Sequence, residues 1–208
     1  EAAWPSVFNE EYLINAEKEK GAFTFAALYM GNPQPKDGGV FKEKWLSWCD
    51  EKEVPRLSHV YVSLDPSFGV LRDESVFTVC GVSAKTDELY ILEQSGDSSW
   101  EFPDLIEESK RLAAKYSPLF FLMEGTASGK PLMQHFKRQS KNGNNTYSIN
   151  VKAYPEKGTP LKNKQQKVSQ VLPVFIDDKV ICVRNEDWNY KLFQQVRQFP
   201  FGAHDDRL

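Results

Sequence analysis

Short apolar and aromatic runs alternate with polar turns from residue 57 onward. Strands are predicted at 58–65, 75–84 and 88–95, because these runs are rich in β-branched and aromatic residues and are joined by short turns. The stretch from 101 to 116 spaces its apolar side chains near i, i+3 and i+4, which predicts a helix with one buried face. The pattern therefore indicates a three-stranded meander covered by a helix.

The rest of the chain alternates between strand and helix patterns. The predicted elements are a strand, a helix, a strand, a helix, a small β-hairpin and a last helix, at 119–124, 128–139, 147–154, 161–172, 174–183 and 187–198. In the hairpin, Asp177-Asp178 is predicted to form the turn. This order is that of the ribonuclease-H-like fold. We therefore expect an α/β domain whose mixed sheet, a meander followed by parallel strands, is flanked by helices.

Residues 1–56 have a different character. They combine a polar helical stretch with the turn-rich segment Asn32-Pro-Gln-Pro-Lys-Asp-Gly-Gly39. The chain also starts at Glu1 rather than at a methionine, so we expect it to be part of a longer protein. We interpret 1–56 as a lead-in or linker from an upstream domain, and 57–208 as the main domain.

Acidic residues stand where apolar runs end. Asp65 closes Val60-Tyr-Val-Ser-Leu64, Glu124 closes Leu119-Phe-Phe-Leu-Met123, and Asp205-Asp206 follow Phe199-Pro-Phe-Gly-Ala-His204. An unpaired acid in such a run carries a large desolvation cost, which a bound cation removes. Hard oxygen ligands suit Mg²⁺ or Mn²⁺, the metals that hold phosphate oxygens for in-line attack.

Each acid also has a purely structural interpretation. Asp65, which precedes a proline, fits a turn or a helix cap, and Glu124 fits a pair with a surface lysine. Asp205 and Asp206 fit the acidic first turn of a helix. Only the three sites together favour a metal.

Composition narrows the class of protein without fixing it. The net charge of −3 argues against a uniformly basic, histone-like mode of nucleic-acid binding, although cations bound at an acidic site would leave room for local basic patches. The three cysteines lack Cys-x-x-Cys spacing, and no apolar run approaches the roughly 20 residues of a spanning helix, so we expect a soluble intracellular protein with reduced thiols.

Several motifs, in this order, resemble one family closely: the nuclease domain of the large terminase subunit of tailed bacteriophages. Before the domain, the resemblance includes Trp4-Pro, Asn32-Pro and Gly38-Gly-Val-Phe41 followed by Trp45. Within it, the most specific motifs are Ser63-Leu-Asp-Pro-Ser67 with Asp73, Met123-Glu-Gly-Thr-Ala-Ser-Gly129, Asn163-Lys164 with Lys167, and Phe199-Pro-Phe-Gly-Ala-His-Asp-Asp206. The resemblance covers nearly the whole chain.

The resemblance implies specific roles for these residues. Asp65, Glu124 and one or both of Asp205 and Asp206 would be the catalytic metal ligands. Asp73 would help to hold a metal or a water, although a surface turn acid is an equal alternative. His204 would orient a ligand or lie near the metal, or else be a loop histidine without that role.

A helix of the family that faces the active site carries Lys164 here, together with Lys162 and Lys167. Lys164 would contact the scissile phosphate, whereas lysines on a helix usually form a solvated face. The family commonly has arginine in place of Lys167 and an acid in place of Asn163, so this helix departs from the pattern.

We therefore expect a two-metal-ion endonuclease that cuts double-stranded DNA, with two Mg²⁺ or Mn²⁺ ions bridged by Asp65. One ion, shared with Asp205 or Asp206, would activate water, and the other, shared with Glu124, would stabilise the leaving 3′ oxygen. The implied partners are an ATPase motor domain in the full protein, the portal and the small terminase subunit, in the cytoplasm of the host cell, with no membrane.

Two other classes remain open. One is a different ribonuclease-H-like nuclease of the resolvase or transposase type, and the other is a non-catalytic module that binds DNA or docks on the portal. An ATP site is not expected, because Gly125-Thr-Ala-Ser-Gly-Lys-Pro131 has three residues between its glycines and a proline where a P-loop needs serine or threonine.

Overall fold

A seven-stranded mixed sheet forms the centre of the protein. The computed structural model describes residues 9, 12, 13, 15, 16, 41–67, 73–125, 129–141, 149–155, 164–199 and 207. The strands are β1 (Ser47–Cys49), β2 (Leu57–Asp65), β3 (Ser75–Ser83), β4 (Leu89–Asp97), β5 (Phe120–Glu124), β6 (Val151–Tyr154) and β7 (Val180–Val183). They are arranged in the order β1-β7-β4-β3-β2-β5-β6.

The strand directions agree with the predicted fold. β2, β3 and β4 form an antiparallel meander, and β5 pairs with β2 and β6 with β5 in parallel. β3 lies at the middle of the sheet, and its apolar and β-branched sequence is buried along most of its length. The predicted mixed sheet, a meander followed by parallel strands, is therefore confirmed.

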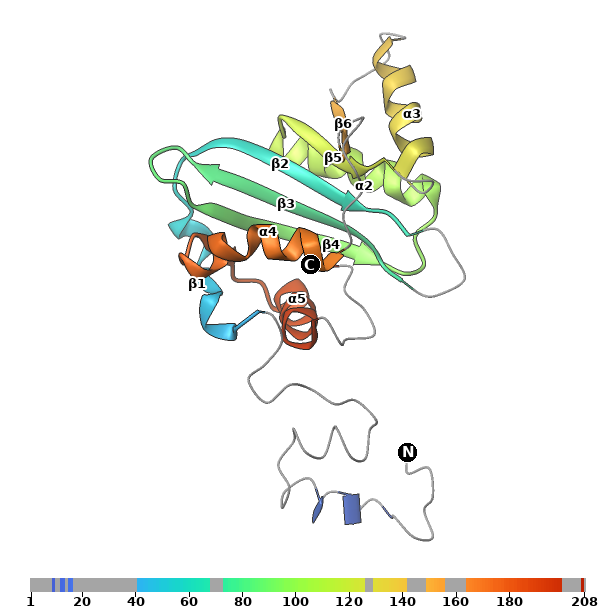
Figure 1. Ribbon diagram of the computed structural model, residues 1–208. Helices are drawn as coiled ribbons and strands as arrows, with labels where there is room; N and C mark the ends of the chain where they lie inside the picture. Colours follow the sequence, from blue (N-terminus) through green and yellow to red (C-terminus); the bar gives the residue numbers. More distant parts are fainter. Residues whose placement is uncertain are drawn as a thin grey trace.

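Four helices cover the two faces of the sheet: α2 (Phe102–Tyr116), α3 (Gly129–Lys141), α4 (Lys164–Ile176) and α5 (Glu186–Gln198). In Figure 1, α4 and α5 lie in front of the sheet, and α2 and α3 lie behind it. Two short 3₁₀ turns, Glu43–Trp45 and Glu51–Glu53, flank β1. Within the part of the chain that the structure describes, no helix combines the length and the apolar character needed to cross a bilayer.

Each face of the sheet has its own hydrophobic core. The first core lies under α2 and α3 and contains Leu64, Phe77 and Met123, whose exposed fractions are 3% or less. The second lies under α4 and α5 and contains Val168, Trp188 and Leu192. Because side chains alternate between the faces of a strand, neighbouring residues of β2 and β5 contribute to opposite cores.

The chain before residue 57 contributes to this domain as well. β1 pairs in parallel with β7 at the sheet edge, and the buried side chains of Phe41 and Leu46 join the second core. Trp48 packs against the same core. The boundary at residue 57 stays a prediction, and at least residues 41–49 lie against the sheet.

One predicted element is wrong. Residues 174–183 do not form a hairpin, since 174–176 are the last residues of α4 and β7 pairs in parallel with β4 and β1. Pro173 lies inside α4, and the N–H of Asp177 still donates to its carbonyl at 3.0 Å. The predicted turn at Asp177-Asp178 does exist, with a left-handed φ of 55° at Asp178, but it connects a helix to a strand.

A charged cluster fastens α2 to β4. The carboxylate of Glu93 accepts hydrogen bonds from Lys115 and Tyr116, both at 2.7 Å, and from Arg111. Burial of Glu93 alone would raise its pKa, but these three hydrogen bonds outweigh burial and lower the pKa to about 2. The cluster therefore holds Glu93 ionised and stabilises the contact between α2 and the sheet.

Candidate metal centre

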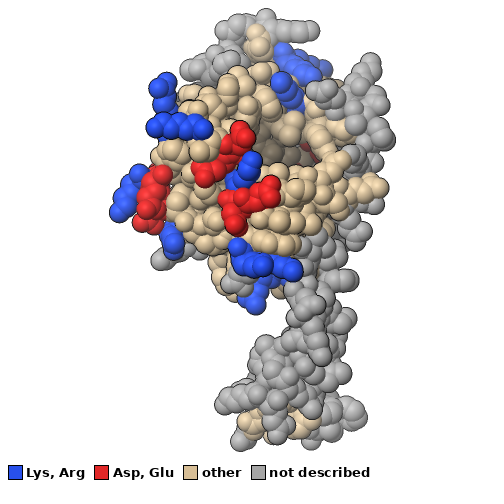
Figure 2. Space-filling model, turned by 60° about the vertical axis from the view of Figure 1, so that its left-hand side comes forward, with Lys and Arg blue, Asp and Glu red and all other residues tan. Residues whose placement is uncertain are grey.

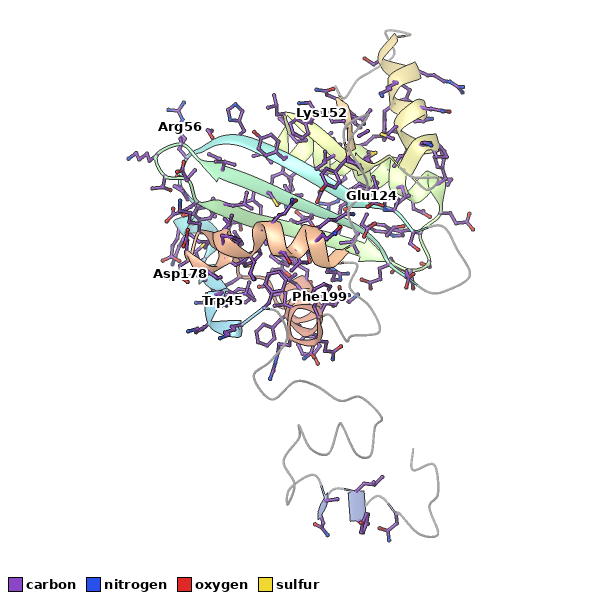
Figure 3. All side chains as sticks on the ribbon, viewed as in Figure 1. Trp45, Arg56, Glu124, Lys152, Asp178 and Phe199 are labelled. Atoms are coloured by element: carbon purple, nitrogen blue, oxygen red, sulfur yellow. The ribbon has the colours of Figure 1, made fainter. Side chains whose placement is uncertain are left out.

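Two of the predicted acids lie on the same face of the sheet. β2 and β5 are parallel neighbours, and Leu64 pairs with Met123, so Asp65 and Glu124 are the next residues at the carboxyl ends of the two strands. The side chains of Leu64 and Met123 point into the core under α2 and α3. Alternation then directs both acids to the opposite face, toward α4. Figure 3 shows Glu124 near these strand ends.

A cavity of about 330 Å³ opens over this face and contains both acids. Its other polar lining residues include Lys167 of α4, Tyr154 of β6 and Arg207. Apolar side chains of α4 and α5, among them Val168 and Leu192, close the remaining wall. An acidic pair at strand ends, next to cationic side chains and partly shielded from water, is a suitable setting for a divalent ion and a phosphate.

Local contacts fix the backbone beside each acid. The hydroxyl of Ser75 donates to the carbonyl of Ser67 and accepts from its N–H, both at 3.0 Å, which holds the chain two residues after Asp65. Beside Glu124, the first residue of α3 is Gly129. A Cβ atom there would lie 2.0 Å from the carbonyl oxygen of Glu124, so this close approach requires glycine.

Glu124 has a cationic partner in this structure. The Nζ atom of Lys167 forms an ion pair with Oε1 of Glu124, and the two side chains are 30% and 26% exposed. The same Nζ lies 5.6 Å from the ring centroid of Tyr154, which is the neighbour of Glu124 across β5 and β6. The alternative interpretation of Glu124, a pair with a lysine, is therefore realised, but the lysine belongs to the cavity rather than to a solvated surface.

The structure does not bring all predicted site residues together. Asp73 is exposed just before β3 and is not among the residues that line the cavity. Lys164 is the first residue of α4, and the structure does not describe its side chain. His204, Asp205 and Asp206 lie outside the described residues. Their roles stay predictions.

Arg207 is a cavity residue for which the sequence motifs assign no role. Its side chain is 2% exposed, and its Nε and a terminal nitrogen contact Oε2 of Glu74 at 2.8 and 2.7 Å. Its backbone N–H donates to the side chain of Gln195, and its carbonyl accepts from the side chain of Gln94 at 3.0 Å. These contacts hold the residue that follows Asp206 against the sheet. The only signal in the sequence was its position directly after the two acids.

The donor set suits a divalent ion but is not complete within the described residues. Among them, no group of three or more histidine, cysteine or acidic side chains could hold a metal. Asp65 and Glu124 supply hard carboxylate oxygens of the kind that Mg²⁺ and Mn²⁺ prefer. A third carboxylate would have to come from a segment outside the described residues.

The surface around the sheet does not present one continuous basic area. In Figure 2, lysine and arginine side chains lie next to aspartate and glutamate side chains over the face that is shown. Among the described residues, Arg111 with Glu108 and Lys110 with Glu107 are examples of such pairs. Attraction of a phosphate backbone to this domain would therefore depend on local charge rather than on net charge.

Comparison with known proteins agrees with this architecture. An α/β domain with a ribonuclease-H-like sheet and acids at the ends of two parallel strands defines the class, and residues 62–208 match the family described as "Terminase RNaseH-like domain". The chain therefore belongs to the terminase RNaseH-like domain family, as its motifs predict. No curated protein gives a significant sequence match.

Solved structures of low sequence identity share the fold. The large terminase nuclease of the thermophilic phage G20c, with bound magnesium, is 17% identical, with a TM-score of 0.57 over 83% of this chain and 94% of that one. The human cytomegalovirus terminase nuclease domain, soaked with manganese, is 12% identical, with a TM-score of 0.52 over 80% and 90%. A large terminase from another thermophilic bacteriophage is 12% identical, with a TM-score of 0.53 over 90% of this chain but only 44% of that one.

Proposed function

We propose that this chain is the nuclease domain of a phage DNA-packaging large terminase and that it cuts double-stranded DNA in a reaction dependent on Mg²⁺ or Mn²⁺. The observation that carries the proposal is the placement of Asp65 and Glu124 at the ends of adjacent parallel strands, facing one cavity. Family membership and the magnesium and manganese in the related nuclease structures support it.

Asp65 and Glu124 would be two of the metal ligands, and Asp205, Asp206 or both would complete the set. Bound metal ions would activate the attacking water and neutralise charge on the phosphate and the leaving oxygen. Asp65 is the bridging ligand in the two-ion form of this proposal, since it lies between β3 and β5 in the sheet.

The remaining predicted residues have supporting roles in the proposal. Lys164 would contact the scissile phosphate from the start of α4, the helix whose Lys167 reaches the cavity. His204 would orient a neighbouring ligand, and Asp73 would act through water, because its position before β3 lies off the cavity wall.

Cleavage of supercoiled plasmid tests the proposal directly. The wild-type chain should convert plasmid to nicked and linear forms with Mg²⁺ or Mn²⁺ and not with EDTA. The variant Asp65→Asn should lose about 100-fold or more of the rate, the order found when one preorganised charge-stabilising group is removed. The substitution keeps the size of the side chain, so folding should be preserved.

A matched control is Asp87→Asn, which removes an acid of the β3–β4 turn that is 93% exposed. It should cut like the wild type. Cleavage that survives in Asp65→Asn would contradict the ligand assignment. Absence of cutting with either metal, together with absence of metal binding, would favour a non-catalytic module that docks on DNA or on the portal.

The biological setting forms part of the same proposal. Residues 57–208 would be the nuclease unit, and 1–56 would lead from an ATPase motor domain, since the chain spans only 44% of the second thermophilic-phage large terminase. The portal and the small terminase subunit would be its partners in the cytoplasm of the host cell. Co-purification of the full-length protein with portal protein tests this part separately.

A further inference from the structure

The ammonium of Lys167 occupies one oxygen of a proposed metal ligand. Lys167 extends from α4 into the cavity and pairs with Oε1 of Glu124, although a lysine on a helix normally keeps its ammonium in water. Both side chains are partly shielded, so the pair is stronger than an exposed surface ion pair. Glu124 therefore has a resident counter-charge within the chain itself.

A divalent ion and this ammonium cannot both contact the same carboxylate oxygen. Two cations a few ångströms apart repel each other strongly in a partly shielded cavity. We propose, building on the proposed metal site, that Lys167 competes with the divalent cation for Glu124: the lysine holds Glu124 when no metal is present and leaves it when metal binds. Lys167 would thus be a positioning residue that sets the metal affinity of the nuclease.

Tyr154 provides a place for the displaced ammonium. Its ring centroid lies 5.6 Å from Nζ of Lys167 in the present arrangement, within the range of a cation–π contact. Because Tyr154 is beside Glu124 in the sheet, a change of side-chain torsions moves the ammonium from the carboxylate to the ring without moving α4. The exchange would therefore need no change of fold.

Titration of Mn²⁺ into the metal-free protein, followed by calorimetry without DNA, tests this competition. Lys167→Met should bind Mn²⁺ about tenfold more tightly, because a charge-assisted hydrogen bond contributes about 1.4 kcal/mol or more and that amount corresponds to a factor of ten. The same variant should unfold at a lower temperature in EDTA, because Glu124 loses its partner. A merely structural lysine would lower stability without raising metal affinity.

The chain offers a closely matched control. Lys115 also pairs with a glutamate, Glu93, and its Nζ also lies over a tyrosine ring, 4.9 Å from the centroid of Tyr116. Lys115→Met should be less stable but should bind Mn²⁺ with wild-type affinity. Lys167→Gln serves as a second neutral variant with the same expected gain in affinity if Lys167→Met does not fold.

Two results are distinguishable. Mn²⁺ affinity that is unchanged or weaker in the folded Lys167 variants, while Glu124→Gln abolishes or weakens binding, overturns the competition and leaves the metal site intact. Mn²⁺ binding that is absent in the wild type, or unaffected by Glu124→Gln, overturns the proposed metal site itself.

Discussion

The contact between Arg207 and Glu74 gives a quantitative prediction about the end of the chain. Arg207→Met keeps the apolar stem of the side chain and removes a guanidinium that is 2% exposed and hydrogen-bonded to Glu74. Breaking a buried ion pair costs about 3–5 kcal/mol. Glu74 is 22% exposed and keeps a second partner, Lys191, at 2.9 Å, so we expect about 2–3 kcal/mol.

Urea unfolding and thermal unfolding measure this loss. For a domain of this size, the expected loss lowers the melting temperature by about 4–12 °C. The control is Lys191→Met, which removes the other partner of Glu74, is 50% exposed, and should cost less than about 1 kcal/mol. A double-mutant cycle with Glu74→Gln isolates the energy of the pair.

Two results would refute this reasoning. One is a loss below about 1 kcal/mol for Arg207→Met, and the other is an equal loss in both single variants. Because Arg207 directly follows Asp206, the variant should also bind Mn²⁺ more weakly if one of the preceding acids is a ligand. Unchanged metal affinity would separate the stability of this segment from the metal site.

Two further predictions concern the backbone beside the site and the response to acid. Gly129→Ala should destabilise the protein by about 1–3 kcal/mol and slow cleavage, because the new methyl group displaces Glu124, as unfolding and plasmid assays would show; Gly125→Ala, whose Cβ meets its nearest neighbour at 3.7 Å, should have little effect. Glu93 has a pKa lowered to about 2, so it contributes stability that is present above its unfolded pKa of about 4.5 and is lost as the pH falls toward 2. Unfolding in urea at pH 5 and pH 3 should show a smaller decline for Glu93→Gln than for the wild type, and equal declines would exclude this group as the cause.

Long periodic elements could be predicted from the sequence alone, and short or interrupted ones could not. The meander and α2 have strong two-residue and 3.6-residue patterns, so their bounds agree closely with the prediction. β1 has only three residues and shows no period. The hairpin prediction failed because Pro173 and the β-branched residues after it suggested a strand, whereas packing on the sheet keeps them in α4.

The candidate site divides in the same way. Asp65 and Glu124 could be predicted because acids at strand ends have a local signature. Their shared face follows from the parallel pairing of β2 with β5. The partners of Lys167 and Arg207 lie 43 and 133 residues away in the sequence, and such pairings depend on how α4 and the chain end pack against the sheet. No local pattern encodes them.

A crystal structure of the protein soaked in Mn²⁺, with anomalous data collected at the manganese edge, tests the central claim most directly. We predict an anomalous peak in the cavity at a distance of about 2.0–2.3 Å from carboxylate oxygens of both Asp65 and Glu124, with Nζ of Lys167 withdrawn from Glu124. The same soak of Asp65→Asn crystals should show a weaker peak or none. A cavity without manganese in the wild type, or manganese bound only away from these two carboxylates, would contradict the claim.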